Sequence, residues 1–242
     1  MINGKIWTVK DASFDRALDL ANKTGISTLL AKVFISRGMD REDMIKDFLR
    51  RSLGDLHDPF LMTDMDKAAD RIIAAVRAKE KIAVYGDYDV DGVASTSVLY
   101  DFLAGLGADV VYYVPDRFGE GYGISIPAMD SLLLEGVSLV ITVDCGTTAI
   151  NEIKYITVVV TDHHECKGVI PDATAVVNPC RPGCAYPFKE LAGVGVVYKL
   201  VHAVCIRLGM DGLQNKYLDF VSIGTVADVV PLTGENRILV KH

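Results

Sequence analysis

Apolar residues follow two different patterns along this chain. From residue 13 to residue 77 they recur every three or four positions, which is the period of an amphipathic helix. From residue 81 onward, short apolar runs rich in valine and isoleucine alternate with further stretches of helical period. Continuous apolar runs are typical of strands that are buried on both faces of a sheet. The second pattern therefore predicts an α/β fold, a parallel sheet flanked by helices, preceded by an N-terminal helical segment.

The first 77 residues are expected to form a helical segment that packs on the domain made by residues 78–242. Ser13 and Asp40 stand where the N-caps of two of its helices are expected, and Gly38 is expected to end another. The helices are predicted over 13–24, 27–38, 40–52 and 65–81, with a loop over 56–64.

The remaining residues are expected to supply the sheet and its helices. Strands are predicted over 81–86, 108–116, 137–146, 157–165 and 173–179. Helices are predicted over 93–107, 125–136, 149–155, 193–209 and 215–230. Because helices lie between several of the strands, the connections suit parallel crossovers.

The composition allows one large domain or two small ones and excludes several classes of protein. The 242 residues are 50% hydrophobic, yet no window has the roughly 18 unbroken apolar residues of a membrane span. The first 20 residues carry charges throughout and lack the apolar centre of a secretory signal. We therefore expect an intracellular, cytoplasmic protein that does not act at a membrane.

The five cysteines and the net charge of −7 limit which metal sites and which binding partners are expected. An odd number of cysteines without a secretory signal favours reduced thiols. Cys180 and Cys184 have the spacing of half a zinc site, but no second pair is well placed, so ordinary thiols are favoured. The negative charge argues against a simple basic nucleic-acid binder. It leaves room for a nucleic-acid enzyme, because bound divalent cations reverse the charge of an acidic site.

Acidic residues follow three of the predicted strands at their carboxyl ends. In "VYGDYDVDGVAS", three aspartates alternate within five residues directly after an apolar run. At about 5 Å and an effective dielectric near 20, two such charges repel by roughly 3 kcal/mol. The carboxyl ends of parallel strands meet in one crevice, so these groups are expected to converge there. The residues concerned are Asp87, Asp89 and Asp91, then Asp144, then Asp162, His163 and His164, with Asp228 nearer the end of the chain.

A metal centre explains this conjunction better than the ordinary roles, which are separate helix caps and a solvated histidine pair. The sequence "DYDVDG" fits the start of an EF-hand loop, but position twelve, which should be Glu, is Val98 in an apolar stripe. The motif "DVDGV" fits the haloacid-dehalogenase-like phosphatases, with Asp89 as nucleophile and Asp91 as acid, and leaves both histidines unexplained. A two-metal hydrolase uses every acid and both histidines, and its mixed ligands suit manganese better than magnesium or calcium.

Four motifs of this chain resemble, in number, order and spacing, those of the DHH phosphoesterases. They are "VYGDYDVDGVAS", "VITVDCG", "VVVTDHHE" and "GTVADVVPL". Three further segments are similar to that family, namely "LHDPFLMTDMDKA", "RFGEGYG" and "NPCRPGCAYPFKELAGVGVVYKL". Within the family, the chain is similar to the branch that degrades single-stranded DNA from its 5′ end. The likeness covers nearly the whole chain.

The resemblance implies a two-metal phosphodiesterase that removes 5′-mononucleotides from single-stranded DNA in repair and recombination. It implies two manganese ions, with magnesium as the alternative, and departure of the 3′ oxygen of the released nucleotide. Asp144 would bridge the two ions, and His164 would act beside the scissile phosphate as a proton donor or charge stabiliser. Asp162 would orient a histidine without touching metal. The other metal ligands implied are Asp87, Asp89, Asp91, His163 and Asp228.

Contacts to DNA are implied for two further segments. Arg117 could hold a phosphate and Tyr122 could stack on a base, the alternatives being an exposed arginine and a packed tyrosine. Gly193 and Gly195 could let a helix N-terminus approach a phosphate, the alternative being close helix packing. The implied partners are single-stranded DNA, a single-strand-binding protein and a helicase.

The chain departs from the family pattern at two places. Asp144 and Asp162 are closer in sequence than is usual, so the helix between them is expected to be clipped, unless a disordered segment was left out of the sequence. The chain also stops about where the helix to a DHHA1 domain should begin, so part of the DNA-binding groove is expected to be missing. Two other functions stay open: a DHH phosphodiesterase for short oligonucleotides or cyclic dinucleotides, and an inactive DHH scaffold that binds replication proteins.

Overall fold

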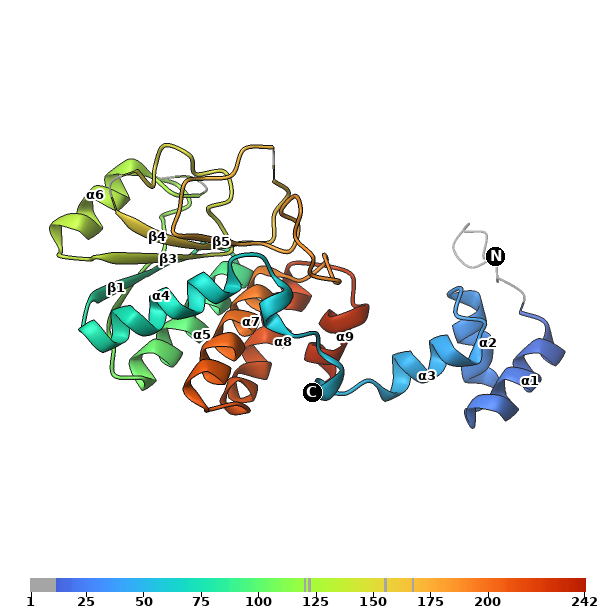
Figure 1. The fold of residues 1–242 in the computed structure, drawn as a ribbon. Helices are drawn as coiled ribbons and strands as arrows, with labels where there is room; N and C mark the ends of the chain where they lie inside the picture. The colour runs from blue at the N-terminus through green and yellow to red at the C-terminus, as the bar shows by residue number, and fades with distance from the viewer. Residues whose placement is uncertain (1–11, 120, 122, 155, 167) are drawn as a thin grey trace. The chain divides into compact units, whose positions relative to one another are not determined.

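The computed structural model describes residues 12–242 apart from residues 120, 122, 155 and 167. These residues form two units along the chain, Met1–Asp55 and Leu56–His242 (Figure 1). This division comes earlier than the expected boundary at residue 77, so the helix before the first strand belongs to the second unit. The packing of the helical segment on the other domain stays a prediction. In the part of the chain that is described, no helix has both the length and the apolar character needed to cross a bilayer.

The first unit is built from short helices around a small apolar core. Its elements are α1 (Phe14–Thr24), α2 (Thr28–Ser36), α3 (Glu42–Arg50) and the 3₁₀ helix η1 (Leu53–Asp55). The core residues are Ala17, Leu20, Ala21, Ala31, Phe34 and Ile45. The predicted cap of α3 by Asp40 is wrong. Arg41 stands at the N-cap, because the Asp40 carboxylate accepts a hydrogen bond from Arg16 at 2.7 Å instead.

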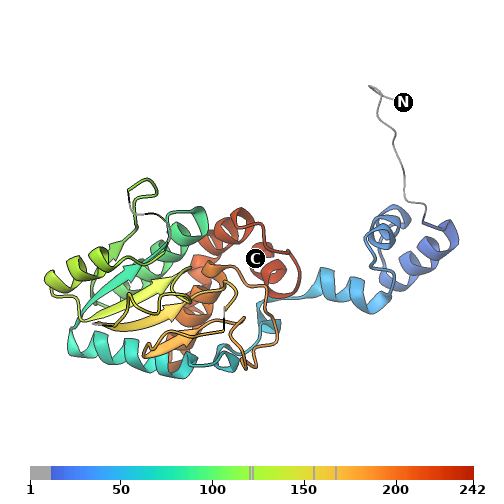
Figure 2. The same cartoon turned by 90° about the horizontal axis from the view of Figure 1, so that it is seen from above.

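Parallel strands form the sheet of the second unit, which confirms the predicted α/β class. The described strands are β1 (Lys81–Tyr85), β2 (Asp109–Tyr113), β3 (Leu139–Val143), β4 (Thr157–Thr161) and β5 (Ala175–Val177). Their order is β2-β1-β3-β4-β5, and every neighbouring pair is parallel (Figure 2). The chain moves outward from β1 to β2 and then returns past β1 to β3. In an open sheet, ligands bind beyond the carboxyl ends of the strands at such a reversal of direction.

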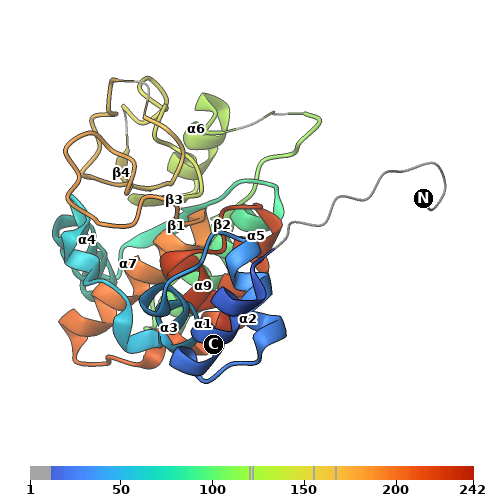
Figure 3. The same ribbon diagram turned by 90° about the vertical axis from the view of Figure 1, so that its right-hand side faces the viewer.

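Helices cover both faces of this sheet. On one face lie α4 (Met65–Ala78), α5 (Val90–Gly105) and α7 (Gly193–Leu208), and on the other lies α6 (Ile126–Leu134) (Figures 1 and 3). The side chains of β1 alternate between the two faces. Ala83 and Tyr85 join the core beneath α6, whereas Ile82 and Val84 are buried against the opposite layer. Burial on both faces is the reason for the unbroken apolar runs in the sequence.

The connection from β3 to β4 differs from the sequence prediction. Residues 149–154 form turns, where the sequence predicts a helix over 149–155, and residue 155 lies outside the described part of the chain. A parallel connection needs about a dozen residues even without regular structure, and this one is little longer. The connection is therefore close to the minimum length, as the close spacing of Asp144 and Asp162 already indicates, and its described residues contain no helix.

The C-terminal helices pack around α7 and hold a buried ion pair. They are η3 (Leu213–Tyr217), α8 (Leu218–Ala227) and α9 (Gly234–Lys241), and η2 (Pro59–Leu61) precedes α4. Lys199 of α7 is fully buried, and its ammonium group donates hydrogen bonds to Glu235 at 2.6 Å and to the His57 carbonyl at 2.8 Å. The Tyr186 hydroxyl and the His57 N–H also donate to Glu235. Burial lowers the pKa of Lys199, and the charge of Glu235 opposes that effect.

We expect Glu235→Ala to lower the free energy of unfolding by about 3–5 kcal/mol, because it leaves the Lys199 ammonium buried without its counter-charge. Urea denaturation of both proteins measures the difference. The matched control is Glu135→Ala, which removes an exposed carboxylate 3.9 Å from Lys81. That change should cost less than about 1 kcal/mol. Equal losses in the two variants would show that the buried pair carries no special weight.

Candidate metal centre

The loop after β1 brings three carboxylates to the carboxyl end of the sheet. Gly86 is required there, because a Cβ at this position would lie 1.9 Å from the Thr96 hydroxyl oxygen. Asp87 is buried and Asp89 is exposed. Asp89 is also the N-cap of α5, and one of its oxygens accepts the Gly92 N–H at 2.9 Å. Its other oxygen remains available to a cation.

Asp91 meets the N-terminus of α7. Its two carboxylate oxygens accept the N–H groups of Gly193 at 2.7 Å and Val194 at 2.9 Å. These are the first residues of α7, where a helix carries N–H groups without intrahelical partners and a partial positive charge. The helix end therefore stabilises a carboxylate of the protein itself.

This contact changes the interpretation of Gly193 and Gly195. A Cβ on Gly193 would lie 2.3 Å from Asp144 Oδ1, so the glycine lets α7 approach Asp91 and Asp144. The N–H of Gly193 donates to Asp91, and the approach of this helix end to a phosphate stays a prediction. A Cβ on Gly195 would lie 3.1 Å from the Leu191 side chain, so this glycine fits the alternative role, which is close packing of the helix.

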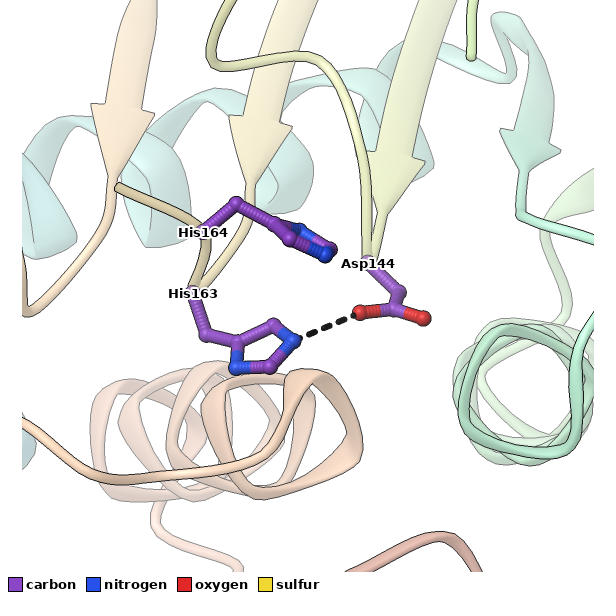
Figure 4. A group of neighbouring side chains, drawn as sticks. All are labelled: Asp144, His163 and His164. Carbon is purple, nitrogen blue, oxygen red and sulfur yellow. Dashed lines mark ion pairs between the residues drawn. The ribbon is translucent and has the colours of Figure 1, made fainter. Parts of the chain in front are cut away.

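Asp144 follows β3 in a strained conformation. Its φ angle is 60°, in the left-handed region that a residue with a Cβ rarely adopts. Its carboxylate is 2% exposed and lies 3.2 Å from His163 Nε2 (Figure 4). Such strain persists only where the surrounding structure holds it, and it is common at functional sites.

His163 lies at the centre of the carboxylates. Its Nε2 atom is 3.2 Å from Asp144 Oδ1, 3.7 Å from Asp228 Oδ2 and 4.0 Å from Asp91 Oδ2. Asp228 is the C-cap of α8, so side chains from the segments that follow β1, β3 and β4 meet one from the end of α8. The crevice forms where the strand order reverses between β1 and β3.

The donor atoms fit divalent cations. Three sets of side chains could each hold an ion, with their donor atoms within 4.8 Å of one another: Asp87 with Asp89 and Asp144, Asp91 with His163 and Asp228, and Asp144 with His163 and His164. Three buried atoms of these sets, Asp144 Oδ1, His163 Nε2 and Asp228 Oδ2, have no hydrogen-bond partner among the described residues. Buried polar atoms normally make hydrogen bonds, so carboxylate oxygens that meet an imidazole nitrogen at 3.2 and 3.7 Å without a hydrogen bond indicate a cation site.

The same crowding perturbs the pKa values. Burial and the charges of Asp91 and Asp89 raise the pKa of Asp144 to about 7. Burial also raises the pKa of Asp91 to about 6, against the opposing effect of the α7 N–H groups. Burial alone would lower the pKa of His163, but the neighbouring carboxylates raise it to about 9. In the absence of a cation, bound protons therefore neutralise part of the negative charge of these carboxylates.

His164 and Asp162 form a separate pair beside the centre. Asp162 Oδ1 accepts the backbone N–H groups of His163 and His164 and the Nδ1–H of His164 at 2.8 Å, and its Oδ2 accepts the Thr147 N–H at 2.9 Å. Burial would raise the pKa of Asp162, but these contacts lower it to about 2. The pairing with Asp162 raises the pKa of His164. Because Nδ1 faces Asp162, Nε2 is the ring nitrogen that points away from this pair, and the ring borders a cavity of about 510 Å³.

The predicted DNA-binding residues are only partly described. The Arg117 guanidinium lies over the ring of Tyr88, 5.4 Å from its centroid, beside the loop that carries Asp87 and Asp89. Tyr122 lies outside the described residues. Sequence reasoning missed Thr147 and Asn178, which are buried polar residues beyond the ends of β3 and β5. The available signal for Asn178 is a polar amide directly after an apolar run, in "AVVNP".

This chain belongs to the DHH family: residues 81–225 match the model of the DHH family, N-terminal domain. Single-stranded-DNA-specific exonuclease RecJ of Bacillus subtilis (strain 168) is 45% identical over 238 residues, covering 96% of this chain and 30% of that protein. A solved structure of exonuclease RecJ bound to manganese matches with a TM-score of 0.69 and 38% identity over 74% of this chain and 47% of the other. RecJ from Thermus thermophilus in complex with Mn²⁺ matches with a TM-score of 0.74 and 32% identity over 95% of this chain and 33% of the other. The chain thus spans less than half the length of these relatives.

Gly193→Ala should weaken divalent-metal binding by about 10- to 100-fold, because the new Cβ forces the Asp144 carboxylate to move. Titration calorimetry with Mn²⁺ measures the affinity. The matched control is Gly195→Ala, whose Cβ would meet only the Leu191 side chain, at 3.1 Å. Unchanged affinity in the Gly193 variant would remove Asp144 from the set of ligands.

Metal binding should release more than one proton at pH 7. Without a cation, His163 with a pKa of about 9 is protonated at that pH, and Asp144 with a pKa of about 7 is partly protonated. A metal ligand must be deprotonated, so affinity should rise with pH up to about 9 and fall further below pH 6, where Asp91 also takes up a proton. Calorimetry in buffers of different ionisation enthalpy counts the protons. The control variant His202→Gln, which is changed outside this centre, should release the same number of protons. Metal binding without proton release would show that His163 and Asp144 are not ligands.

Proposed function

We propose that this chain is a two-metal phosphodiesterase that degrades single-stranded DNA from its 5′ end and releases 5′-mononucleotides. The observation that carries the proposal is the set of buried donor atoms without hydrogen-bond partners among the described residues, on Asp144, His163 and Asp228. The proposal is also supported by the 45% identity to a single-stranded-DNA-specific exonuclease.

The six side chains that we assign to the metals fall into two groups that share Asp144. Asp87, Asp89 and Asp144 would hold one ion, and Asp91, His163 and Asp228 would complete the second with Asp144 as the bridge. Mixed carboxylate and imidazole donors favour Mn²⁺, and Mg²⁺ is the alternative. When bound, two such ions lower the pKa of water and neutralise charge on a phosphoryl oxygen. The solved structures of RecJ in complex with Mn²⁺ or Mg²⁺ support a divalent cation as the bound group.

His164 is the side chain that we assign to proton transfer. Asp162 holds its Nδ1–H and raises its pKa, which favours the imidazolium form that carries a proton on Nε2. That proton can stabilise the charge on the scissile phosphate or pass to the departing 3′ oxygen. The side chain is 47% exposed, which leaves it accessible to a substrate.

Recognition of the strand is proposed to involve residues around this centre. Arg117 is the candidate for a phosphate contact, because its guanidinium lies beside the Asp87–Asp91 loop. The partners that we propose are single-stranded DNA, a single-strand-binding protein and a helicase. The setting is DNA repair and recombination in the cytoplasm. The chain spans 30% of the B. subtilis relative.

With Mn²⁺, this protein should shorten a 3′-labelled single strand stepwise from its 5′ end. His164→Ala should slow that reaction by about 10²- to 10⁴-fold while metal binding is kept. Gel analysis of the labelled strand, beside a dinucleotide substrate, tests both points, and His202→Ala is the matched histidine control. Cleavage of the dinucleotide alone would favour a short-oligonucleotide phosphodiesterase. Metal binding without any hydrolysis would favour an inactive scaffold.

A further inference from the structure

Asn178 is a fully buried amide whose side-chain nitrogen and oxygen are both used. It follows β5 directly and is 0% exposed. Its amide nitrogen donates to Thr147 Oγ1 at 2.9 Å and to the His164 carbonyl at 2.9 Å, and its oxygen accepts the Cys180 N–H at 2.7 Å. The Cys180 N–H can only donate and the His164 carbonyl can only accept, so these contacts fix which way the amide points.

These hydrogen bonds close a ring around the loop that carries His164. Asp162 accepts the Thr147 N–H and the His164 N–H, and Asn178 holds the Thr147 hydroxyl and the His164 carbonyl. His164 is therefore held by Asp162 at its own N–H and by Asn178 at its own carbonyl. Fixing both sides of one residue restricts its φ and ψ angles, and with them the direction of its side chain.

The loop that these hydrogen bonds hold has little other support in the described part of the chain. The loop that follows β3 carries Thr147 and continues into the turns at 149–154, and the described residues of this connection include no helix that could brace it. A functional side chain on a loop is less exactly placed than one on a helix or strand, unless a second layer of contacts holds it. Asn178 supplies that layer from the end of β5.

We propose that Asn178 is a positioning residue that keeps the His164 ring aimed at the reacting phosphate by holding Thr147 and the His164 carbonyl. The inference rests on the proposed function, because it assigns the purpose of the ring to phosphodiester hydrolysis. Asn178 is fully buried and belongs to none of the three candidate ion-binding sets. Its removal is expected to act through His164 alone.

Two substitutions distinguish the effect of the Asn178 hydrogen bonds on His164 from the effect of its packing in the core. Asn178→Leu keeps the branching and the number of heavy atoms of the side chain and loses every hydrogen bond. Asn178→Asp keeps the shape and the Cys180 contact, but it cannot donate to the His164 carbonyl. Both should lower kcat for single-stranded DNA with Mn²⁺ by about 10- to 100-fold, while KM and the Mn²⁺ affinity change less than about threefold. Asn215→Leu is the matched control, since it removes a partly buried amide that accepts a hydrogen bond from Tyr198.

A double variant tests the route of the effect. If Asn178 acts through His164, then Asn178→Leu combined with His164→Ala should be no slower than His164→Ala alone. Additive losses would overturn the proposal. So would a changed KM or Mn²⁺ affinity at constant kcat, which would make Asn178 a support for substrate or metal.

Proton NMR of the metal-free protein provides a readout that does not depend on activity. The Nδ1 proton of His164, held by Asp162, should give a downfield signal that Asn178→Leu and Asn178→Asp remove or broaden and Asn215→Leu preserves. An unchanged signal in both Asn178 variants would overturn the proposal. If the unaltered protein shows this signal but cuts no DNA, the proposed function fails and the positional part of the inference is still tested.

Discussion

The constraint on which this structure depends is the repulsion among carboxylates that a parallel sheet brings to one edge. Each strand end delivers its own acids, and the reversal between β1 and β3 places two of these sets side by side. The protein compensates some of these charges with its own N–H groups. Asp91 receives the N-terminus of α7, and Asp162 receives three backbone N–H groups and His164.

The charges that are not compensated define the site. Asp144 and Asp228 keep buried oxygens without a hydrogen-bond partner among the described residues, beside the Nε2 atom of His163. An uncompensated buried charge either takes up a proton or binds a cation. The raised pKa values of Asp144 and His163 express the first outcome, and a bound divalent ion would replace it with the second. Glycine at 193 and at 224 lets two helices come close enough to share this crevice, since a Cβ at Gly224 would lie 2.8 Å from Asp91.

Much of this arrangement is predictable from the sequence, because it is encoded locally. The apolar runs fix the strands, and acids that directly follow strands must lie at one edge of a parallel sheet. The strand pattern alone therefore predicts that Asp87, Asp144 and His163 lie close together, whatever the positions of the helices.

The failed predictions concern contacts between distant parts of the chain. The contact of the α7 N-terminus with Asp91, which lies 102 residues away from Gly193, was also not predicted, and the approach of that helix end to a phosphate stays a prediction. The local pattern of "AINEIKY" suits a helix, but the described residues of this short crossover form turns instead. The predicted cap Asp40 is drawn to Arg16 on another helix. In each case a tertiary contact overrides a local preference, and no local signal reports it.

The position of Asp228 shows how a remote buried network reaches the metal centre. Val229, the next residue, has a φ angle of 63°, which for a β-branched residue costs about 1–2 kcal/mol and requires support from its surroundings. That support comes from α9. Asn236 donates to the Pro231 carbonyl at 3.1 Å, and Glu235 ties the start of α9 to Lys199 in the middle of α7. The N-terminus of α7 also holds Asp91. The same helix is therefore in direct contact with the ligand candidate Asp91, and it is connected through α9 to the turn that follows the ligand candidate Asp228. The buried ion pair therefore links α9 to the helix that holds Asp91, although neither of its members belongs to the candidate ion-binding sets.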